Sequence, residues 1–228
     1  MEGFDVLRRL FKPHPWHGIP IGDGAPETVS AYVEIVPSDT VKYEVDKASG
    51  YLRVDRPQRF SNVCPSLYGF IPQTFCGERT AELCRKRTGR RDIGGDQDPL
   101  DVCILSERTF THGDFLLRAM PIGGLRLIDH GEADDKIIAV LEGDTMFSGL
   151  RELDELPGPQ LERLEHYFLT YKKPPRPGPY EVELDGVYGR AEAHRVIEAS
   201  REDYRARFPD LEEQLARLLA GTKPEVAG

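Results

Sequence analysis

The chain has 228 residues, of which 39 are acidic and 30 are basic, so its formal net charge is -9 and its isoelectric point is near 5.3. This length is enough for one sizeable core, and no Ser-rich or Gly-rich linker divides the sequence, so we expect a single domain over residues 1–228. The acidic balance argues against a nucleic-acid partner, because phosphate backbones are bound by basic surfaces.

The sequence has no pattern typical of export or of a membrane span. Residues 1–9 are too charged for the apolar region of a signal peptide, and no later segment approaches the roughly 18 apolar residues of a spanning helix. The four cysteines, at positions 64, 76, 84 and 103, lack paired Cys-x-x-Cys spacing, so we expect free thiols. These features predict a cytoplasmic protein with no membrane partner.

Short strand patterns joined by turns rich in Gly and Asp fill the chain up to residue 141. The expected strands are 31–36, 41–46, 51–55, 101–105, 115–121, 125–129 and 136–141. Many short antiparallel strands predict an α+β fold that is mainly β, built as a small closed antiparallel β-barrel of the OB type.

The C-terminal half adds two or more helices that pack on this barrel. Apolar residues at helical spacing run from Leu161 to Tyr171, after Pro157 and Pro159, and again from Ala193 to Phe208. Residues 210–219 predict a further short amphipathic helix. We expect residues 221–228 to form a disordered tail.

The segment Asp96-Gln97-Asp98-Pro99-Leu100-Asp101 sets three carboxylates within six residues. Carboxylate oxygens are the ligands that hard divalent cations prefer, and carboxylates this close repel one another unless a cation, a proton or water relieves the charge. An apolar strand pattern follows at once. The segment therefore predicts a metal site at the mouth of a buried strand.

This acidic segment has three other interpretations. A solvated acidic turn is the simplest reading of a lone Asp-x-Asp. A calcium-binding loop fails, because Leu100 takes an oxygen-donating position and Asp101 stands where the sharp turn requires Gly. An aspartate-based phosphatase would need an apolar strand just before Asp96, and residues 90–95 do not supply one.

A second group of charged residues lies outside the acidic segment. Residues 41–46 alternate, so Lys42 and Glu44 share one face of an expected strand that forms a hairpin with residues 51–56. Further along come Asp129, the acidic cluster 132–135 and the pair at positions 171 and 172. Carboxylates suited to metals and cations suited to an anion thus recur along one chain.

Taken in order, these blocks resemble the soluble family I inorganic pyrophosphatases of the bacterial type. Residues 96–102 fit the signature Asp-x-Asp-Pro-apolar-Asp-apolar, and the resemblance extends over residues 32–208, within a core that we place at 30–208. The other matching blocks are Val33-Glu34-Ile35, Lys42 to Lys47, Val54-Asp55-Arg56, Tyr68-Gly69-Phe70, Pro121-Ile122-Gly123, Asp134-Asp135-Lys136 and Tyr171-Lys172.

The resemblance implies a role for each site residue. Asp96, Asp101 and Asp134 would hold the tightest Mg²⁺, with Asp101 also reaching a second ion. Asp129 and Glu34 would bind ions that arrive with substrate, and Glu44 would lie behind them. Asp98 would be the general base, with Tyr171 also assigned to catalysis. The phosphate-binding set would be Lys42, Arg56, Tyr68, Lys136, Tyr171 and Lys172.

The implied activity is Mg²⁺-dependent hydrolysis of inorganic pyrophosphate to two orthophosphates, by direct attack of a water that lies between two metal ions. An acidic chain should repel this polyanion, so several metal ions, with Mn²⁺ or Zn²⁺ as substitutes for Mg²⁺, would mediate the encounter. The alternative is a catalytically silent barrel that keeps the metal site as a binding module.

Two departures from the family pattern stand out. Cys64 takes a position that usually carries a Tyr, so a hydroxyl near the phosphates is missing or comes from elsewhere. Residues 76–95 form a basic insertion, which we expect to be a solvated loop; a sharper hypothesis is that it draws polyanions toward the metals. His166 matches a subunit-contact position whereas Thr170 does not, so we expect a homo-oligomer of open order.

Overall fold

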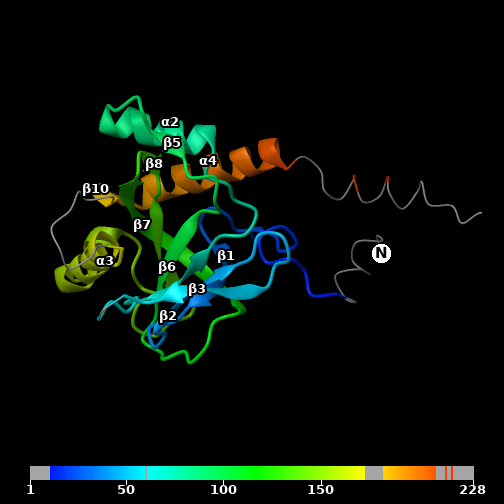
Figure 1. Ribbon diagram of the computed structural model, residues 1–228. Coiled ribbons are helices and arrows are strands. Elements are labelled where there is room, and N and C mark those ends of the chain that lie inside the picture. Colours follow the sequence, from blue (N-terminus) through cyan, green and yellow to red (C-terminus); the bar gives the residue numbers. More distant parts are fainter. Residues whose placement is uncertain (1–10, 60, 173–181, 209–213, 215–216, 218–228) are drawn as a thin grey trace, which may run out of the picture.

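Ten strands and three α-helices order the part of the chain that the computed structural model describes, namely residues 11–59, 61–172, 182–208, 214 and 217 (Figure 1). The strands are β1 (Val29–Ile35), β2 (Val41–Val45), β3 (Leu52–Pro57), β4 (Leu67–Phe70), β5 (Gly94–Gly95), β6 (Asp101–Leu105), β7 (Phe115–Asp129), β8 (Glu132–Ala133), β9 (Lys136–Leu141) and β10 (Val182–Gly189). The helices are α2 (Glu78–Thr88), α3 (Gly158–Thr170) and α4 (Arg190–Arg207), with a short 3-10 helix, η1, at Leu153–Glu155.

The main sheet joins five strands in a ring of pairings. Starting at β1, the hydrogen-bonded neighbours are β4, β6, β9 and β7, and β7 pairs again with β1. Buried side chains cover both faces of these strands: Val33 and Val102 belong to one apolar cluster and Ile138 to another, and none of the three is exposed. The expectation of a mainly β fold with packed helices is confirmed.

The pairing is not purely antiparallel, so that part of the prediction is wrong. β6 and β9 run parallel, as do β5 and β8. The cause is the order of the strands. β9 runs antiparallel to β7, and its other edge pairs with the earlier strand β6, to which it is parallel.

The two strands expected over 115–121 and 125–129 are one strand, β7. Its first half pairs with β1 and its second half with β10, while β9 lies along its other edge. Gly123 sits where these partners crowd together, and a Cβ there would lie only 2.4 Å from the carbonyl oxygen of Tyr188. Glycine thus lets β7 continue through the position that looks like a break in the sequence.

Helices α3 and α4 are confirmed close to their expected bounds. α3 buries Leu164, Tyr167 and Phe168 against the strands, and α4 buries a stripe that includes Val196 and Ile197. Among the described residues, no helix is long and apolar enough to cross a membrane. Most of the expected helix 210–219 and the whole tail 221–228 lie outside the described residues. All four cysteines are free and buried, as expected.

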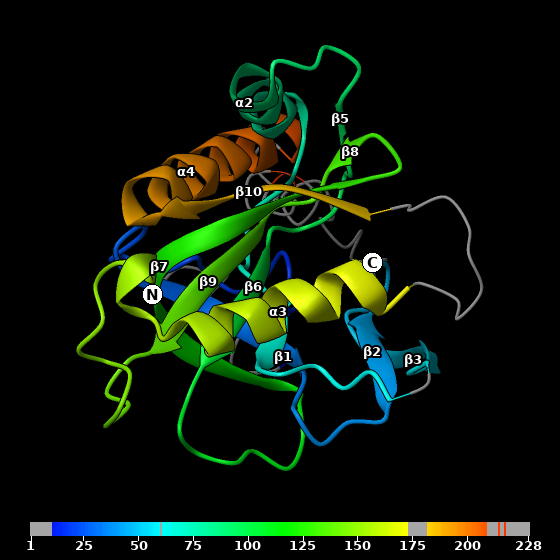
Figure 2. The same cartoon turned by 90° about the vertical axis from the view of Figure 1, so that its left-hand side faces the viewer.

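The basic insertion is a helix, which corrects the expectation of a loop. Its sequence suits a helix, with Glu78 in the first turn, Arg85, Lys86 and Arg87 in the last, and Gly89 in the left-handed conformation (φ 73°) at its end. The buried stripe consists only of Thr80, Ala81 and Cys84, too small to show as an apolar pattern. In Figure 2, α2 lies beside α4 on one side of the sheet, and the β2–β3 hairpin lies on the opposite side.

A carboxylate from α4 fixes the first turn of α2. Asp203 is only 4% exposed and accepts hydrogen bonds from the backbone amides of Gly77 (3.1 Å), Arg79 (3.2 Å) and Thr80 (3.0 Å). It also accepts from the Thr80 hydroxyl (3.0 Å) and the Arg79 guanidinium (3.1 Å). α2 has no side-chain cap of its own, so Asp203 supplies that cap from another helix.

Asp203→Ala is expected to lower the free energy of unfolding by about 1–2 kcal/mol, because the amides at the start of α2 lose their acceptor. Denaturant unfolding followed by circular dichroism measures the change. The matched control is Glu202→Ala, whose side chain is 59% exposed and only pairs with Arg79, so it should cost less than about 1 kcal/mol. Equal losses in the two variants would contradict the capping role.

Candidate active site

A parallel strand pairing brings the start of the acidic motif beside Asp134. β5 pairs with β8 with Gly95 opposite Ala133, and Asp96 and Asp134 are the next residues on the two strands. Burial and the negative charge of Asp134 raise the pKa of Asp96 well above its usual range. Two carboxylates from segments 38 positions apart thus share one buried place.

The second parallel pairing adds Asp101 and Lys136, which lie opposite each other in β6 and β9. The Lys136 ammonium is 2% exposed and contacts the carboxylates of both Asp101 and Asp134. Burial alone would lower its pKa, but these two carboxylates raise it well above the usual value. The Tyr68 hydroxyl donates to Asp101 at 2.6 Å. Lys136 therefore balances the charge of the acidic cluster.

The cluster has the donors that a hard divalent cation requires, namely carboxylate oxygens in a confined place. Burial raises the pKa of Asp101, although the Lys136 ammonium and the Tyr68 hydroxyl both favour its charged form. Lys136 lowers the pKa of Asp134 in spite of burial. Within the described residues, no group of three or more His, Cys, Asp or Glu side chains is arranged so that it could hold a metal ion, and the Lys136 ammonium lies among these carboxylates.

Glu34 of β1 and Lys42 of β2 line a cavity next to the acidic loop that carries Asp98. Glu34 is 6% exposed and accepts the Val45 amide at 2.7 Å, and burial raises the pKa of this carboxyl to about 8. The Lys42 ammonium lies 3.4 Å from Glu44 and 3.1 Å from Asp55. Asp55 was not among the predicted site residues. It stands two residues after Arg53 in β3, so the period of a strand already placed both side chains on the charged face of the hairpin.

Asp98 lies on a loop whose backbone is firmly held. Its carbonyl accepts the Cys76 amide at 2.8 Å, its amide donates to the Asp96 carboxylate at 3.0 Å, and Gln97 between them has a left-handed φ of 65°. The Asp98 carboxylate is 45% exposed and contacts the Lys47 ammonium. Sequence reasoning missed this partner, because Lys47 comes just after a strand in an ordinary turn.

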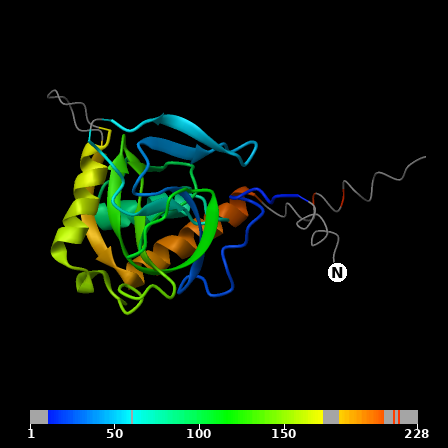
Figure 3. The ribbon, with the colours of Figure 1, turned by 90° about the horizontal axis from the view of Figure 1, so that it is seen from below.

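The residues near the end of α3 that the sequence predicted to bind phosphate form a second group. The Lys172 ammonium contacts Asp129 at the end of β7 and lies 5.3 Å from the centre of the Tyr171 ring. The Arg56 guanidinium lies 5.8 Å from the same ring centre. This proximity links β3 of the hairpin, cyan at the top of Figure 3, to the end of α3, the yellow helix at the left. Tyr171 is thus flanked by two cations.

A cavity of about 160 Å³ opens between the hairpin and the acidic loop. Five predicted residues line it: Glu34, Lys42, Tyr68, Asp98 and Asp101, together with the predicted outer residue Glu44. Asp96, Asp129, Asp134, Arg56, Lys136, Tyr171 and Lys172 are not on its wall. Lys136 and Tyr68 connect it to the buried carboxylates. Trp16 also lines it, and no pattern in the sequence pointed to this residue, which precedes the recognised blocks.

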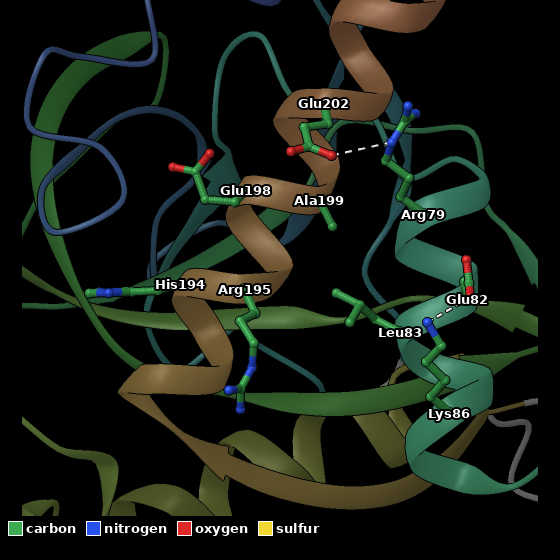
Figure 4. A pocket seen from close by; sticks show the side chains of 9 residues that line it. All are labelled: Arg79, Glu82, Leu83, Lys86, His194, Arg195, Glu198, Ala199 and Glu202. Atoms are coloured by element: carbon green, nitrogen blue, oxygen red, sulfur yellow. Dashed lines mark ion pairs between the residues drawn. The ribbon is translucent and has the colours of Figure 1, made fainter.

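A larger cavity of about 530 Å³ lies between α2 and α4, away from these residues (Figure 4). On the wall of this cavity, Arg79 of α2 pairs with Glu202 of α4, and Lys86 pairs with Glu82 of the same helix. Five of the six cations of the insertion have an acidic partner in the structure: Arg79, Arg85, Lys86, Arg87 and Arg90. These pairs offset part of the positive charge of the insertion, and its attraction of polyanions stays a prediction.

Cys64 is buried beside Tyr167, and burial raises the pKa of its thiol to about 11. The Tyr167 ring stacks on Tyr171, with ring centres 5.1 Å apart. Tyr167 therefore brings a hydroxyl close to the position where the family usually has its Tyr. Its own partner is Gln58 at 3.5 Å.

A mainly β domain in which buried carboxylates face Lys and Arg side chains is the arrangement of a metal-dependent enzyme that acts on a phosphate anion. A family model described as inorganic pyrophosphatase matches residues 31–205. The chain belongs to the inorganic pyrophosphatase family, and it is an enzyme that hydrolyses inorganic pyrophosphate.

Individual relatives agree with this assignment. The inorganic pyrophosphatase of Chlamydia caviae is 50% identical over 199 residues, which cover 86% of this chain and 92% of the relative. A soluble inorganic pyrophosphatase of Oryza sativa subsp. japonica is 41% identical over 160 residues, 70% of this chain and 66% of the relative. The solved inorganic pyrophosphatase of Thermus thermophilus has a TM-score of 0.69 at 27% identity, covering 82% of this chain and 97% of that chain.

Proposed function

We propose that pyrophosphate hydrolysis by this protein uses Mg²⁺, held by Asp96, Asp101 and Asp134. The observation that carries the proposal is the pair of parallel registers, which gathers these carboxylates and Lys136 from separate strands into one buried cluster. When bound, Mg²⁺ would lower the pKa of a water molecule and neutralise phosphate oxygens. Asp129 and Glu34 would bind the ions that accompany substrate, with Glu44 behind them.

Lys136 has two tasks under this proposal. Without divalent cations its ammonium compensates the charge of Asp101 and Asp134. With those carboxylates engaged, the ammonium is left to bind a phosphate oxygen. Tyr68, which donates to Asp101 at the cavity wall, is placed to bind a phosphate oxygen in the same way.

Asp98 is the proposed general base. Its carboxylate lines the cavity, is accessible to water, and is oriented by Lys47 and by the fixed backbone of its loop. It would take the proton of the attacking water, while Lys42, Arg56 and Lys172 bind the charge of the leaving phosphate. Tyr171, held between Arg56 and Lys172, would donate to that phosphate.

Some finer features stay predictions. We infer that the ring of pairings from β1 to β7 closes a small OB-like barrel. A homo-oligomer, a cytoplasmic location, the absence of nucleic-acid partners and the use of Mn²⁺ or Zn²⁺ in place of Mg²⁺ are expectations from the sequence. Light scattering after size exclusion measures the oligomeric state.

Release of orthophosphate from pyrophosphate, followed with and without Mg²⁺, tests the proposal. We expect release only with a divalent cation, and loss on addition of a chelator. Mg²⁺ binding without phosphate release would instead identify a silent binding module. Release that is unaffected by the chelator would contradict the metal assignment.

Asp101→Asn is expected to raise the Mg²⁺ concentration for half-maximal activity far more than Asp98→Asn does. Asp101 lies in the buried cluster of proposed ligands, whereas Asp98 faces the open cavity and Lys47. Activity as a function of Mg²⁺ concentration and titration calorimetry both measure the effect. Equal Mg²⁺ requirements in the two variants would remove the distinction between ligand and base.

A further inference from the structure

Asp135 lies between two residues of the proposed site, yet it belongs to a separate ionic chain behind them. We propose that this chain, Arg87–Glu192–Arg126–Asp135, is a positioning device that holds Asp134 and Lys136 in place by anchoring them to the inserted helix α2. The proposal rests on the roles given to Asp134 and Lys136 above. It gives the insertion a positioning role that is independent of its exposed charges.

Asp135 is held in place by an ion pair with Arg126. Successive side chains of an extended segment point to opposite faces, so Asp135 points away from Asp134 and Lys136. Its carboxylate is 2% exposed and lies 3.6 Å from the Arg126 guanidinium. Within the described part of the chain, neither carboxylate oxygen has a hydrogen bond, and the same holds for Nε of Arg126 and the hydroxyl of Tyr188.

Arg126 makes the only ion pair of Asp135 among the described residues. A buried carboxylate without compensation is costly, so a shift of Asp135 away from Arg126 would leave the Asp135 charge without its ion pair in the interior. Arg126 itself cannot follow easily, because it is 5% exposed and its guanidinium lies 4.9 Å from the centre of the Tyr188 ring. The pair therefore fixes the backbone from which Asp134 and Lys136 extend.

The chain continues from Arg126 to the inserted helix. Arg126 Nη2 donates to Glu192 at 3.1 Å, and Glu192 of α4 is 7% exposed. Arg87 of α2 binds the same carboxylate with both Nε (3.0 Å) and Nη2 (2.8 Å), a fork that fixes direction as well as distance. Arg195 of α4 adds a third cation to Glu192. The end of α2 is thus linked through α4 and β7 to Asp135.

The insertion also contacts residues 133–136 through apolar side chains and through backbone pairing. Cys84 of α2 packs with Ile93, Ile128 and Ala133, and Ala133 directly precedes Asp134. β5, the last part of the insertion, pairs with β8 at Ala133. The segment 133–136 is therefore restrained on the side that faces α2, opposite the side that carries Asp134 and Lys136.

Mg²⁺ binding measured by titration calorimetry in the absence of substrate tests this device. Asp135→Asn should weaken Mg²⁺ binding by roughly tenfold, the lower range for residues that support metal ligands. The double variant Asp135→Leu/Arg126→Met removes both charges and should regain thermal stability without regaining Mg²⁺ affinity. Mg²⁺ affinity that equals the parent's in either variant overturns the proposal, because the pair would then contribute stability alone.

The far end of the chain provides a test that does not disturb the interior. Arg87→Met should weaken Mg²⁺ binding at least about twofold, since the residue lies within the network but contacts neither metal ligand nor substrate. The matched control is Lys86→Met on the same helix, whose ammonium pairs only with Glu82 and is 67% exposed; it should bind Mg²⁺ like the parent. If Asp135→Asn fails to fold, this comparison decides, and equal affinities in the two variants overturn the proposal.

Failure of this proposal and failure of the proposed function give different results. The parent protein, tested first, must bind Mg²⁺ and need it for phosphate release; if it does not, the metal assignment fails whatever the variants do. If the parent behaves as expected and Asp135→Asn and Arg87→Met bind Mg²⁺ as the parent does, only the positioning role is lost.

Discussion

Asp98→Asn is expected to lower turnover by roughly 10²- to 10⁴-fold at saturating Mg²⁺, the usual contribution of general base catalysis. The substitution keeps the shape of the side chain but removes the site that would accept the proton of the attacking water. The fold should be unaffected, because the carboxylate is 45% exposed and the loop is held by its backbone. Initial rates of phosphate release measure the change.

A matched control separates this effect from a general loss of charge. Asp92→Asn removes a carboxylate of the insertion that is 76% exposed and lies outside the cavity, so turnover should stay near the parent value. The Michaelis constant should also change less than turnover in Asp98→Asn. Near-normal turnover in that variant would show that another group accepts the proton.

Lys136→Met is expected to lower the free energy of unfolding by about 3–5 kcal/mol in the absence of divalent cations, because it leaves two buried carboxylates without their cation. The loss should be smaller at saturating Mg²⁺, since binding of the cation to the folded state stabilises it. Denaturant unfolding at both conditions measures the difference. Phosphate release should fall under either condition, because the proposed phosphate contact is gone.

Lys86→Met serves as the control for this second experiment. Its ammonium is 67% exposed and pairs with Glu82 in the next turn of α2, so its loss should cost less than about 1 kcal/mol at any Mg²⁺ concentration. If Lys136→Met were equally destabilised with and without Mg²⁺, the cations would not bind the carboxylates that Lys136 contacts.

The sequence indicated which residues lie together better than it indicated the path of the chain through space. The residues that share a cavity with Asp98 stood out by their types and spacing, and β9 was found because it is a continuous apolar run. The parallel pairing of β6 and β9 could not be found in this way, since register depends on which strand edges remain free. β10 was missed because Asp185 and Gly186 interrupt its apolar alternation, at the place where its pairing with β7 shifts register.

Other misses follow from contacts between distant segments. Helix α2 has too small a buried stripe to be recognised alone, and its first turn depends on Asp203, more than 120 positions away. Trp16 reaches the cavity only because its indole donates to the Thr74 carbonyl at 2.7 Å. Lys47 is near Asp98 because the hairpin folds over the acidic loop. None of these contacts leaves a local pattern in the sequence.

The hydrogen bonds at Cys76 have a consequence for how this chain differs in length from shorter relatives. The Cys76 carbonyl accepts the Gln97 amide at 3.0 Å and its amide donates to the Asp98 carbonyl at 2.8 Å, so the chain leaves for α2 and returns at the same place. The inserted residues are a closed excursion whose two ends already touch. Insertion or loss of such a segment leaves the loop of Asp98 intact, because the entropy cost of joining its ends changes little with length. Chain length can therefore vary here without displacing Asp98, while the restraint that α2 places on residues 133–136 changes with it.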